Sequence, residues 1–280
     1  MIYFCAAIYP EAAPILSHFS MKSEGGRYGT LYRSPEAVLI LCGIGPVSCA
    51  LAMAEAFTRI PPSATDVLVQ IGICGAPAEE ASLWEWFRIN KITECDTGRD
   101  FYPDIFLSGS FPEHSLRTVS TVSEAPDSLV DMEAAAAFQA GRPFFSPERM
   151  LFYKCVSDFG TVSLSADASA NAGAVTPDAI SAHVAEALPR ILSEAAEAAK
   201  LFVPDRTLNA EEEAAVIRLA ERIDASAAMT QELHRLSEYL LYRDGSPLPA
   251  LEHALLELTE PIHRKEGKLY LEQFRKDCLS

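Results

Sequence analysis

The feature that most constrains this chain is the stretch of residues 129–160, where acidic residues flank two apolar segments. Asp131 and Glu133 lead into an alanine-rich segment with the composition of a helix. Asp158 follows residues 150–156, an apolar run that is typical of a strand. Carboxylates at a helix entry and at the carboxyl end of a strand lie toward the same edge of an open α/β sheet, where ligands bind. The stretch therefore predicts an α/β protein with a site lined by carboxylates.

A purely structural interpretation of the same acids stays open. Asp131 and Glu133 could be first-turn acids that the helix N-terminus stabilises. Asp158 could cap a helix or a turn after its strand. Such placements are common in α/β proteins whatever their function, so other parts of the chain must decide between the two interpretations.

Strand and turn signals surround this stretch. The apolar run at residues 2–9 predicts a strand buried on both faces, and Glu11 follows it at the junction with a helix. Residues 66–71 predict a central strand. Two glycine turns, residues 43–48 and residues 72–77, follow strands, and glycine lets the backbone approach a ligand closely. Both turns are therefore candidate contact segments.

The remaining predictions for the first part of the chain follow the same α/β pattern. A long helix is expected at residues 177–202, with a break near Pro189. Residues 161–176, rich in Ser, Ala and Gly, predict a loop that is a candidate lid. Further strands are expected at residues 28–33, 37–42, 87–92 and 117–122.

The pattern changes after residue 203, because the strand signals stop there. Residues 204–280 are helical by pattern throughout, with Asn209 as a candidate N-cap. We therefore expect an α/β domain at residues 1–203 and an all-α extension at residues 204–280. The extension is expected to serve packing or a protein partner more than catalysis.

Composition narrows the class of ligand. The chain has 280 residues and an apolar fraction of 49%, enough for a substantial core. Its formal net charge of -16 argues against binding to nucleic acid or to an anionic membrane surface. We expect a small neutral or cationic ligand or a protein partner instead. No apolar run spans a bilayer and no leader pattern is found, so a cytoplasmic location is expected.

The seven cysteines are scattered singly, without a CxxC pair or ligand-spaced histidines. We interpret them as reduced core residues and expect no metal site. Cys74, in the second glycine turn, is the one thiol singled out as a candidate for reactivity. The first glycine turn comes near the GxGxxG pattern, but Ser48 replaces its third glycine. The first glycine turn is the only feature that would support an assignment as a dinucleotide-dependent oxidoreductase.

Five segments resemble, in order, the nucleosidase and nucleoside phosphorylase superfamily. Its members include methylthioadenosine/S-adenosylhomocysteine nucleosidase and futalosine hydrolase. The segments are AIYPEAAPIL, CGIGPVSCA, DVLVQIGICGA, LVDMEAAAAF and CVSDFG, and they lie within residues 1–200. The resemblance implies a three-layer α/β fold around a twisted mixed sheet, a homodimer or larger homo-oligomer, and no metal or organic cofactor.

The resemblance also implies roles for single residues. Asp158 is implied as the acid that protonates or hydrogen-bonds N7 of a purine, and Glu11 as the group that orients and deprotonates the attacking water. Glu133 is implied to hold the ribose hydroxyls, with Met132 against the sugar. Carboxylates of this kind suit the cleavage of an N-glycosidic bond, whose sugar becomes oxocarbenium-like. The other expected substrate-binding residues are Ser157, Gly75 and Ile73.

The sequence favours hydrolysis over phosphorolysis. Phosphorylases of the superfamily place phosphate-binding arginines after the first strand and beside the second glycine turn, and neither segment has an arginine here. A phosphate-dependent nucleoside phosphorylase stays open as an alternative, as does a catalytically silent nucleoside-binding or assembly protein. Ile73 stands where the adenosine-specific nucleosidases have a serine, which leaves the base and the 5′-group open.

Overall fold

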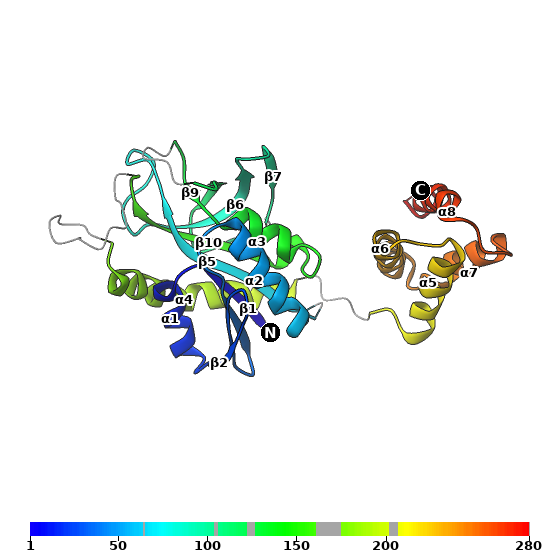
Figure 1. The fold of residues 1–280 in the computed structure, drawn as a ribbon, viewed down its shortest axis with the longest axis horizontal. Helices are drawn as coiled ribbons and strands as arrows, with labels where there is room; N and C mark the ends of the chain where they lie inside the picture. Colours follow the sequence, from blue (N-terminus) through cyan, green and yellow to red (C-terminus); the bar gives the residue numbers. More distant parts are fainter. Residues whose placement is uncertain (64, 104–105, 122–126, 161–174, 202–206, 280) are drawn as a thin grey trace. The chain divides into compact units, whose positions relative to one another are not determined.

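The computed structural model describes residues 1–63, 65–103, 106–121, 127–160, 175–201 and 207–279. The chain forms two compact units, Met1–Val203 and Pro204–Ser280. The first unit is α/β, and the described part of the second is helical (Figure 1). The predicted fold class is therefore confirmed. Most of the predicted loop and candidate lid, residues 161–174, lies outside the described residues.

The first unit is built on a mixed sheet of ten strands. The central strand β5 is parallel to β1 and to β10, and β1 is parallel to β4. Part of the sheet closes on itself, because pairing runs from β5 through β10, β6, β8 and β9 back to β5. The strands are β1 Ile2–Ala6, β2 Lys22–Gly25, β3 Thr30–Arg33, β4 Ala37–Leu41, β5 Val67–Gly75, β6 Trp86–Glu94, β7 Arg99–Phe101, β8 Glu113–Thr118, β9 Val130–Asp131 and β10 Met150–Asp158.

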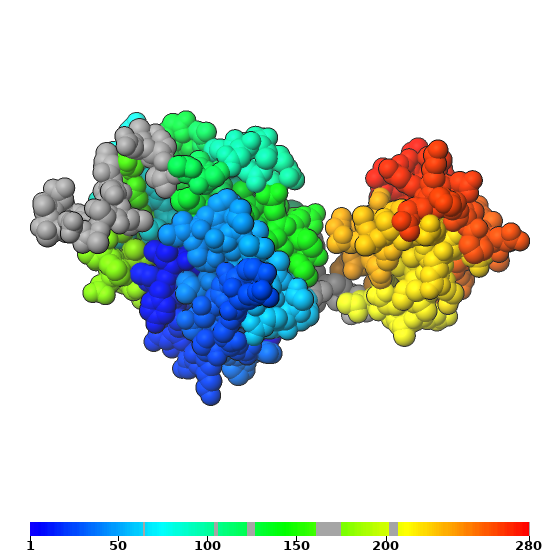
Figure 2. All heavy atoms as spheres, viewed as in Figure 1, coloured from blue at the N-terminus to red at the C-terminus, as the bar shows by residue number. Residues whose placement is uncertain are grey.

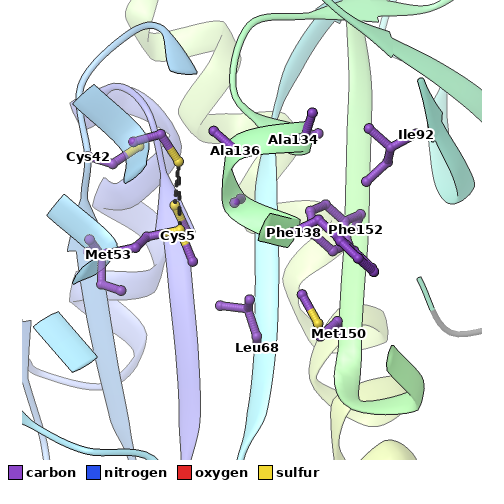
Figure 3. Packing of buried hydrophobic residues seen from close by; sticks show 14 of the residues in the cluster. Cys5, Cys42, Met53, Leu68, Ile92, Ala134, Ala136, Phe138, Met150 and Phe152 are labelled. Atoms are coloured by element: carbon purple, nitrogen blue, oxygen red, sulfur yellow. Dashed lines mark hydrogen bonds between the residues drawn. The ribbon is translucent and has the colours of Figure 1, made fainter. Parts of the chain in front are cut away.

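Helices cover both faces of the sheet and complete three layers. The first core cluster joins one face to α2 (Pro46–Arg59) and α3 (Ala134–Gly141), and Figure 3 shows part of it. The second cluster joins the other face to α1 (Tyr9–His18) and α4 (Pro177–Lys200). Strands buried on both faces need apolar side chains at nearly every position, which explains the apolar run of β1 and the run of β10, which Lys154 interrupts.

The break predicted in the long helix and the bounds of one predicted strand are wrong. The helix α4 continues through Pro189, where a break was predicted. Proline removes one backbone hydrogen bond from a helix, but Val184, Leu188 and Ile191 on either side are buried in the second core cluster and hold the helix to the sheet. The strand predicted at residues 117–122 lies earlier, as β8, because it pairs with β6 from Glu113 onward.

The second unit is a group of four helices with its own core. The predicted cap is confirmed, because Oδ1 of Asn209 accepts hydrogen bonds from the amides of Glu211 and Glu212, at 2.9 and 3.0 Å. Figure 2 shows these helices as a continuous mass of atoms coloured from yellow to red. Among the described residues, no helix is both long and apolar enough to cross a membrane. The helices are α5 Ala210–Arg222, α6 Ala227–Asp244, α7 Leu248–Glu257 and α8 Arg264–Leu279.

Candidate active site

Glu11 lies in the first turn of α1, and its carboxylate is held by three backbone amides. Its Oε2 accepts from the amides of Ala7 and Ile8 at 2.8 and 3.0 Å. Its Oε1 accepts from the amide of Ile73 on β5 at 2.9 Å. Burial raises the pKa of Glu11, and this outweighs the opposing effects of the nearby Lys154 and of the three amides. The side chain is thus a fixed carboxylate with increased basicity.

Glycines on β5 give the charged side chains room. A Cβ at Gly72 would lie 2.9 Å from Oε1 of Glu11 and 3.3 Å from Nζ of Lys154. A Cβ at Gly75 would lie 3.3 Å from Oδ1 of Asp158. The sequence predicted a turn at residues 72–77, but β5 continues to Gly75. The prediction is wrong because these glycines do not end the strand. They lie within β5 and let side chains approach its backbone closely.

Lys154 is the cation at the centre of this group. Its side chain is 1% exposed, and its Nζ lies 2.8 Å from Oδ2 of Asp131. Burial lowers the pKa of Lys154, but the charges of Asp131, Glu133 and Glu11 together raise it well above the ordinary value. The ammonium form of Lys154 is therefore stable inside the protein, and this one buried cation interacts electrostatically with three carboxylates.

Asp131 connects this cation to the start of α3. Its Oδ1 accepts from the Thr118 hydroxyl at 2.7 Å, and its Oδ2 accepts from the amide of Ala134 at 2.8 Å. Asp131 thus satisfies the first amide of α3 from two residues before the N-cap Glu133, whereas the structural interpretation of the sequence expected both acids within the first turn of the helix. Its contacts with Lys154 and Thr118 make it a positioning residue.

Glu133 precedes α3, but its side chain reaches another helix. Its Oε1 accepts from the amide of Gly45, at 2.7 Å, directly before α2. Gly45 has a φ of 96°, a backbone conformation that favours glycine. Burial raises the pKa of Glu133 to about 7, with Asp131 and Glu11 adding to the rise while Lys154 and the Gly45 amide oppose it. Glu133 can therefore exchange a proton near neutral pH.

Asp158 ends β10, and its carboxylate is half-buried. Its Oδ2 accepts from the Ser157 hydroxyl at 2.8 Å, and its Oδ1 accepts from the amide of Gly160 at 2.9 Å. The register between β10 and β5 shifts just before Asp158, which then lies opposite Gly75. The bond from Gly160 is that of a turn residue, so the structural interpretation also accounts for part of this geometry.

The structure brings most of the predicted site residues to one strand end. Glu11 contacts β5 at Ile73, and Asp158 lies beside Gly75. The Gly72 and Gly75 positions are about 10 Å apart at the usual rise of a strand. Ser157 supports Asp158 directly, and Met132 is half-buried beside Glu133.

One charged member of the site, Lys154, was missed by the sequence reasoning, which named Asp131 at a helix entry but gave it no role. A single lysine inside the apolar run of β10 was the available signal, because a charge in a strand buried on both faces needs a partner. The candidate reactivity of Cys74 is wrong. Its side chain is buried and burial raises its pKa, which makes a thiol inert.

A cavity of about 380 Å³ adjoins the backbone that holds Glu11. Ala7 and Ile8, the two amide donors to Oε2 of Glu11, line it. Its lining contains no charged side chain: Ala7, Ile8, Tyr9, Tyr28, Gly29, Thr30, Leu41, Cys42, Gly43 and Ser48.

The fold of the first unit is similar to that of solved 5′-methylthioadenosine/S-adenosylhomocysteine nucleosidases and of a futalosine hydrolase, so the fold that the resemblance implied is confirmed. The 5′-methylthioadenosine nucleosidase of Arabidopsis thaliana has a TM-score of 0.55 and 14% identity, covering 70% of this chain and 95% of that one. A futalosine hydrolase mutant of Helicobacter pylori has a TM-score of 0.55 and 12% identity, with 69% and 98% coverage.

The 5′-methylthioadenosine/S-adenosylhomocysteine nucleosidase of Streptococcus pneumoniae, solved with a transition-state inhibitor, has a TM-score of 0.53 and 18% identity, with 69% and 97% coverage. At such identities the likeness establishes the fold alone. The sequence matches no protein-family model and no curated protein.

Proposed function

We propose that this protein is an N-ribosyl hydrolase that cleaves the glycosidic bond of a purine nucleoside or a 5′-modified purine nucleoside. The observation that carries the proposal is the group of three carboxylates around the buried Lys154. A structural ion pair needs one carboxylate per cation. Additional buried acids with raised pKa values are typical of sites that transfer protons.

Glu11 is proposed to activate the attacking water. The three backbone amides fix its carboxylate, and its raised pKa increases its basicity. A general base works best when its pKa approaches the working pH. In the proposed step, Glu11 takes a proton from water while the water oxygen bonds to C1′ of the ribose.

Glu133 is proposed to bind the ribose hydroxyls, with Met132 against the sugar. Negative charge at this position also stabilises the positive charge that develops on the ribose. Asp158 is proposed to protonate or hydrogen-bond N7 of the leaving purine, with Ser157 holding its carboxylate. The backbone at Ile73 and Gly75 would line the space between the ribose-binding and purine-binding ends of the site. Water and nucleoside then yield free base and free sugar.

Hydrolysis is favoured over phosphorolysis by the cavity next to Glu11. Phosphate binding requires cationic side chains, most often arginine. The residues that line this cavity include neither arginine nor lysine. A phosphorylase would therefore need a cation from elsewhere, such as a second copy of the chain in a homo-oligomer.

The test is release of free base from a panel of nucleosides, with and without phosphate. The panel is methylthioadenosine, S-adenosylhomocysteine, adenosine, inosine, futalosine and uridine. Purine release in phosphate-free buffer, lost in Glu11→Gln and kept in the exposed control Glu24→Gln, is the expected result. Release only with phosphate would make the protein a phosphorylase. Nucleoside binding without any release would favour the catalytically silent alternative.

A further inference from the structure

Three cysteines that lie apart in the sequence meet in the first core cluster, and we call them the thiol cluster. Cys5 lies on β1, Cys42 directly follows β4, and Cys49 lies on α2. Their Sγ atoms all lie within 4.8 Å of one another, and those of Cys5 and Cys49 are 3.9 Å apart. Parallel pairing of β1 with β4 brings the first two together. Sequence spacing could not reveal such a group.

The separation of the sulfur atoms suits a shared metal ion. Three thiolates at about 2.3 Å from one ion lie about 3.8–4.0 Å from each other. The Cys5–Cys49 distance of 3.9 Å already has this value. The other sulfur atoms, within 4.8 Å, need to move by less than about 1 Å.

The surroundings of the thiol cluster are soft and apolar. The Met53 thioether lies 3.7 Å from Sγ of Cys49, and Figure 3 shows Cys5, Cys42 and Met53 on the same side of the core cluster. Within the described residues, the group contains no histidine or carboxylate ligand. Thiolates and thioethers prefer Cu(I), whereas structural zinc takes four cysteine or histidine ligands.

We propose that the thiol cluster is a binding site for one Cu(I) ion. Entry is available from the cavity of about 380 Å³, because Cys42 lines it. The expectation that the chain has no metal site followed from cysteine spacing alone and did not consider this arrangement of thiols.

Copper bound here would also act on the candidate active site. Cys42 and Cys49 flank Gly45, whose amide donates to Glu133 at 2.7 Å. A bound ion would hold the segment between the two cysteines and thereby the Glu133 carboxylate. This consequence rests on the proposed function, whereas copper binding itself does not, so failure of the hydrolase assay leaves the binding test intact.

The test is an anaerobic titration of the full, reduced chain with Cu(I), in competition with the chromophoric chelator bicinchoninate. We expect one equivalent to bind. Cys42→Ser and Cys49→Ser should each weaken binding at least 100-fold, while the matched control Cys95→Ser, a half-buried thiol outside the cluster, should leave it unchanged. Thermal unfolding followed by circular dichroism reports whether each variant folds.

X-ray absorption at the copper edge of the wild-type protein supplies a measurement that needs no variant. Three sulfur neighbours at about 2.3 Å are expected. Fewer than three sulfur neighbours, no uptake against the chelator, an equal loss in Cys95→Ser, or tight Zn(II) binding without Cu(I) binding would each overturn the proposal.

Discussion

At the Lys154 end of the candidate active site, one buried cation serves three carboxylates, whereas at the Asp158 end a hydroxyl and an amide bind one half-buried carboxylate. The first arrangement holds one cation among several carboxylates whose side chains are almost fully buried. The second depends on two neutral donors, the Ser157 hydroxyl and the Gly160 amide. Substitutions at the lysine end should therefore affect folding, and substitutions at the aspartate end should affect the reaction.

The largest effect is expected from Lys154→Met. Removing the cation leaves Asp131, Glu133 and Glu11 as buried carboxylates without compensation, which should cost about 3–5 kcal/mol of unfolding free energy. Urea unfolding at neutral pH measures this loss. The control Lys200→Met removes an exposed lysine that pairs with Glu197, and it should change stability by less than about 0.5 kcal/mol. Equal losses in the two variants would show that Lys154 contributes no more to stability than an exposed lysine does.

Asp158→Asn should separate activity from stability. The amide keeps the size of the side chain and an oxygen that can accept from Gly160, so the unfolding free energy should change by about 1 kcal/mol or less. Base release should fall about 10²- to 10⁴-fold, because the proposed proton donor is lost. Steady-state kinetics on the best nucleoside of the panel measures this, with Asp127→Asn, an exposed carboxylate, as control. Normal turnover in Asp158→Asn would show that the assigned role is wrong.

The raised pKa of Glu133 should make the stability of the protein depend on pH. Its pKa is raised from 4.5 to about 7 in the folded protein, so the folded state holds this proton more tightly than the unfolded chain does. Stability from this group is therefore fully present below about pH 4.5 and is lost as the pH rises toward about 7. The decline is on the order of 3–4 kcal/mol, at about 1.4 kcal/mol for each unit between 4.5 and about 7.

Urea unfolding of wild type and Glu133→Gln from pH 4.5 to pH 8 tests this dependence. The difference between the two proteins isolates Glu133 from other titrating groups. The variant should lack the decline. Parallel curves for the two proteins would show that Glu133 does not retain a proton in the folded state.

The smallest effect is expected from a comparison of alanine substitutions at two glycines of β5. Gly72→Ala places a Cβ 2.9 Å from the Glu11 carboxylate and 3.3 Å from the Lys154 ammonium, so the ionic group must shift, at about 1–3 kcal/mol. Gly75→Ala meets Val130 at 3.2 Å and Asp158 at 3.3 Å, which calls for movements of a few tenths of an ångström. We expect Gly72→Ala to be the less stable variant by about 1 kcal/mol in thermal unfolding. The reverse order would place the tighter packing at the Asp158 end.

Much of the fold could be predicted because its signals are local. The apolar runs of β1 and β10 and the Asn209 cap depend on residues next to one another in the chain, and all three predictions are confirmed. The break at Pro189 and the turn at residues 72–77 failed for the opposite reason. Helix packing on the sheet and side-chain contacts with β5 decided those two segments.

The sequence by itself determined the α/β class, the helical second unit and the carboxylates at strand and helix ends, because hydrophobic periodicity and capping are short-range properties. Only the tertiary structure decided which charges share a space. Lys154 on β10 meets Asp131 on β9 because both strands pair with β5. Cys5 meets Cys42 through the parallel pairing of β1 with β4, and Cys49 through the packing of α2 on the sheet. These side-chain contacts depend on strand order and register, which form only when the whole core packs.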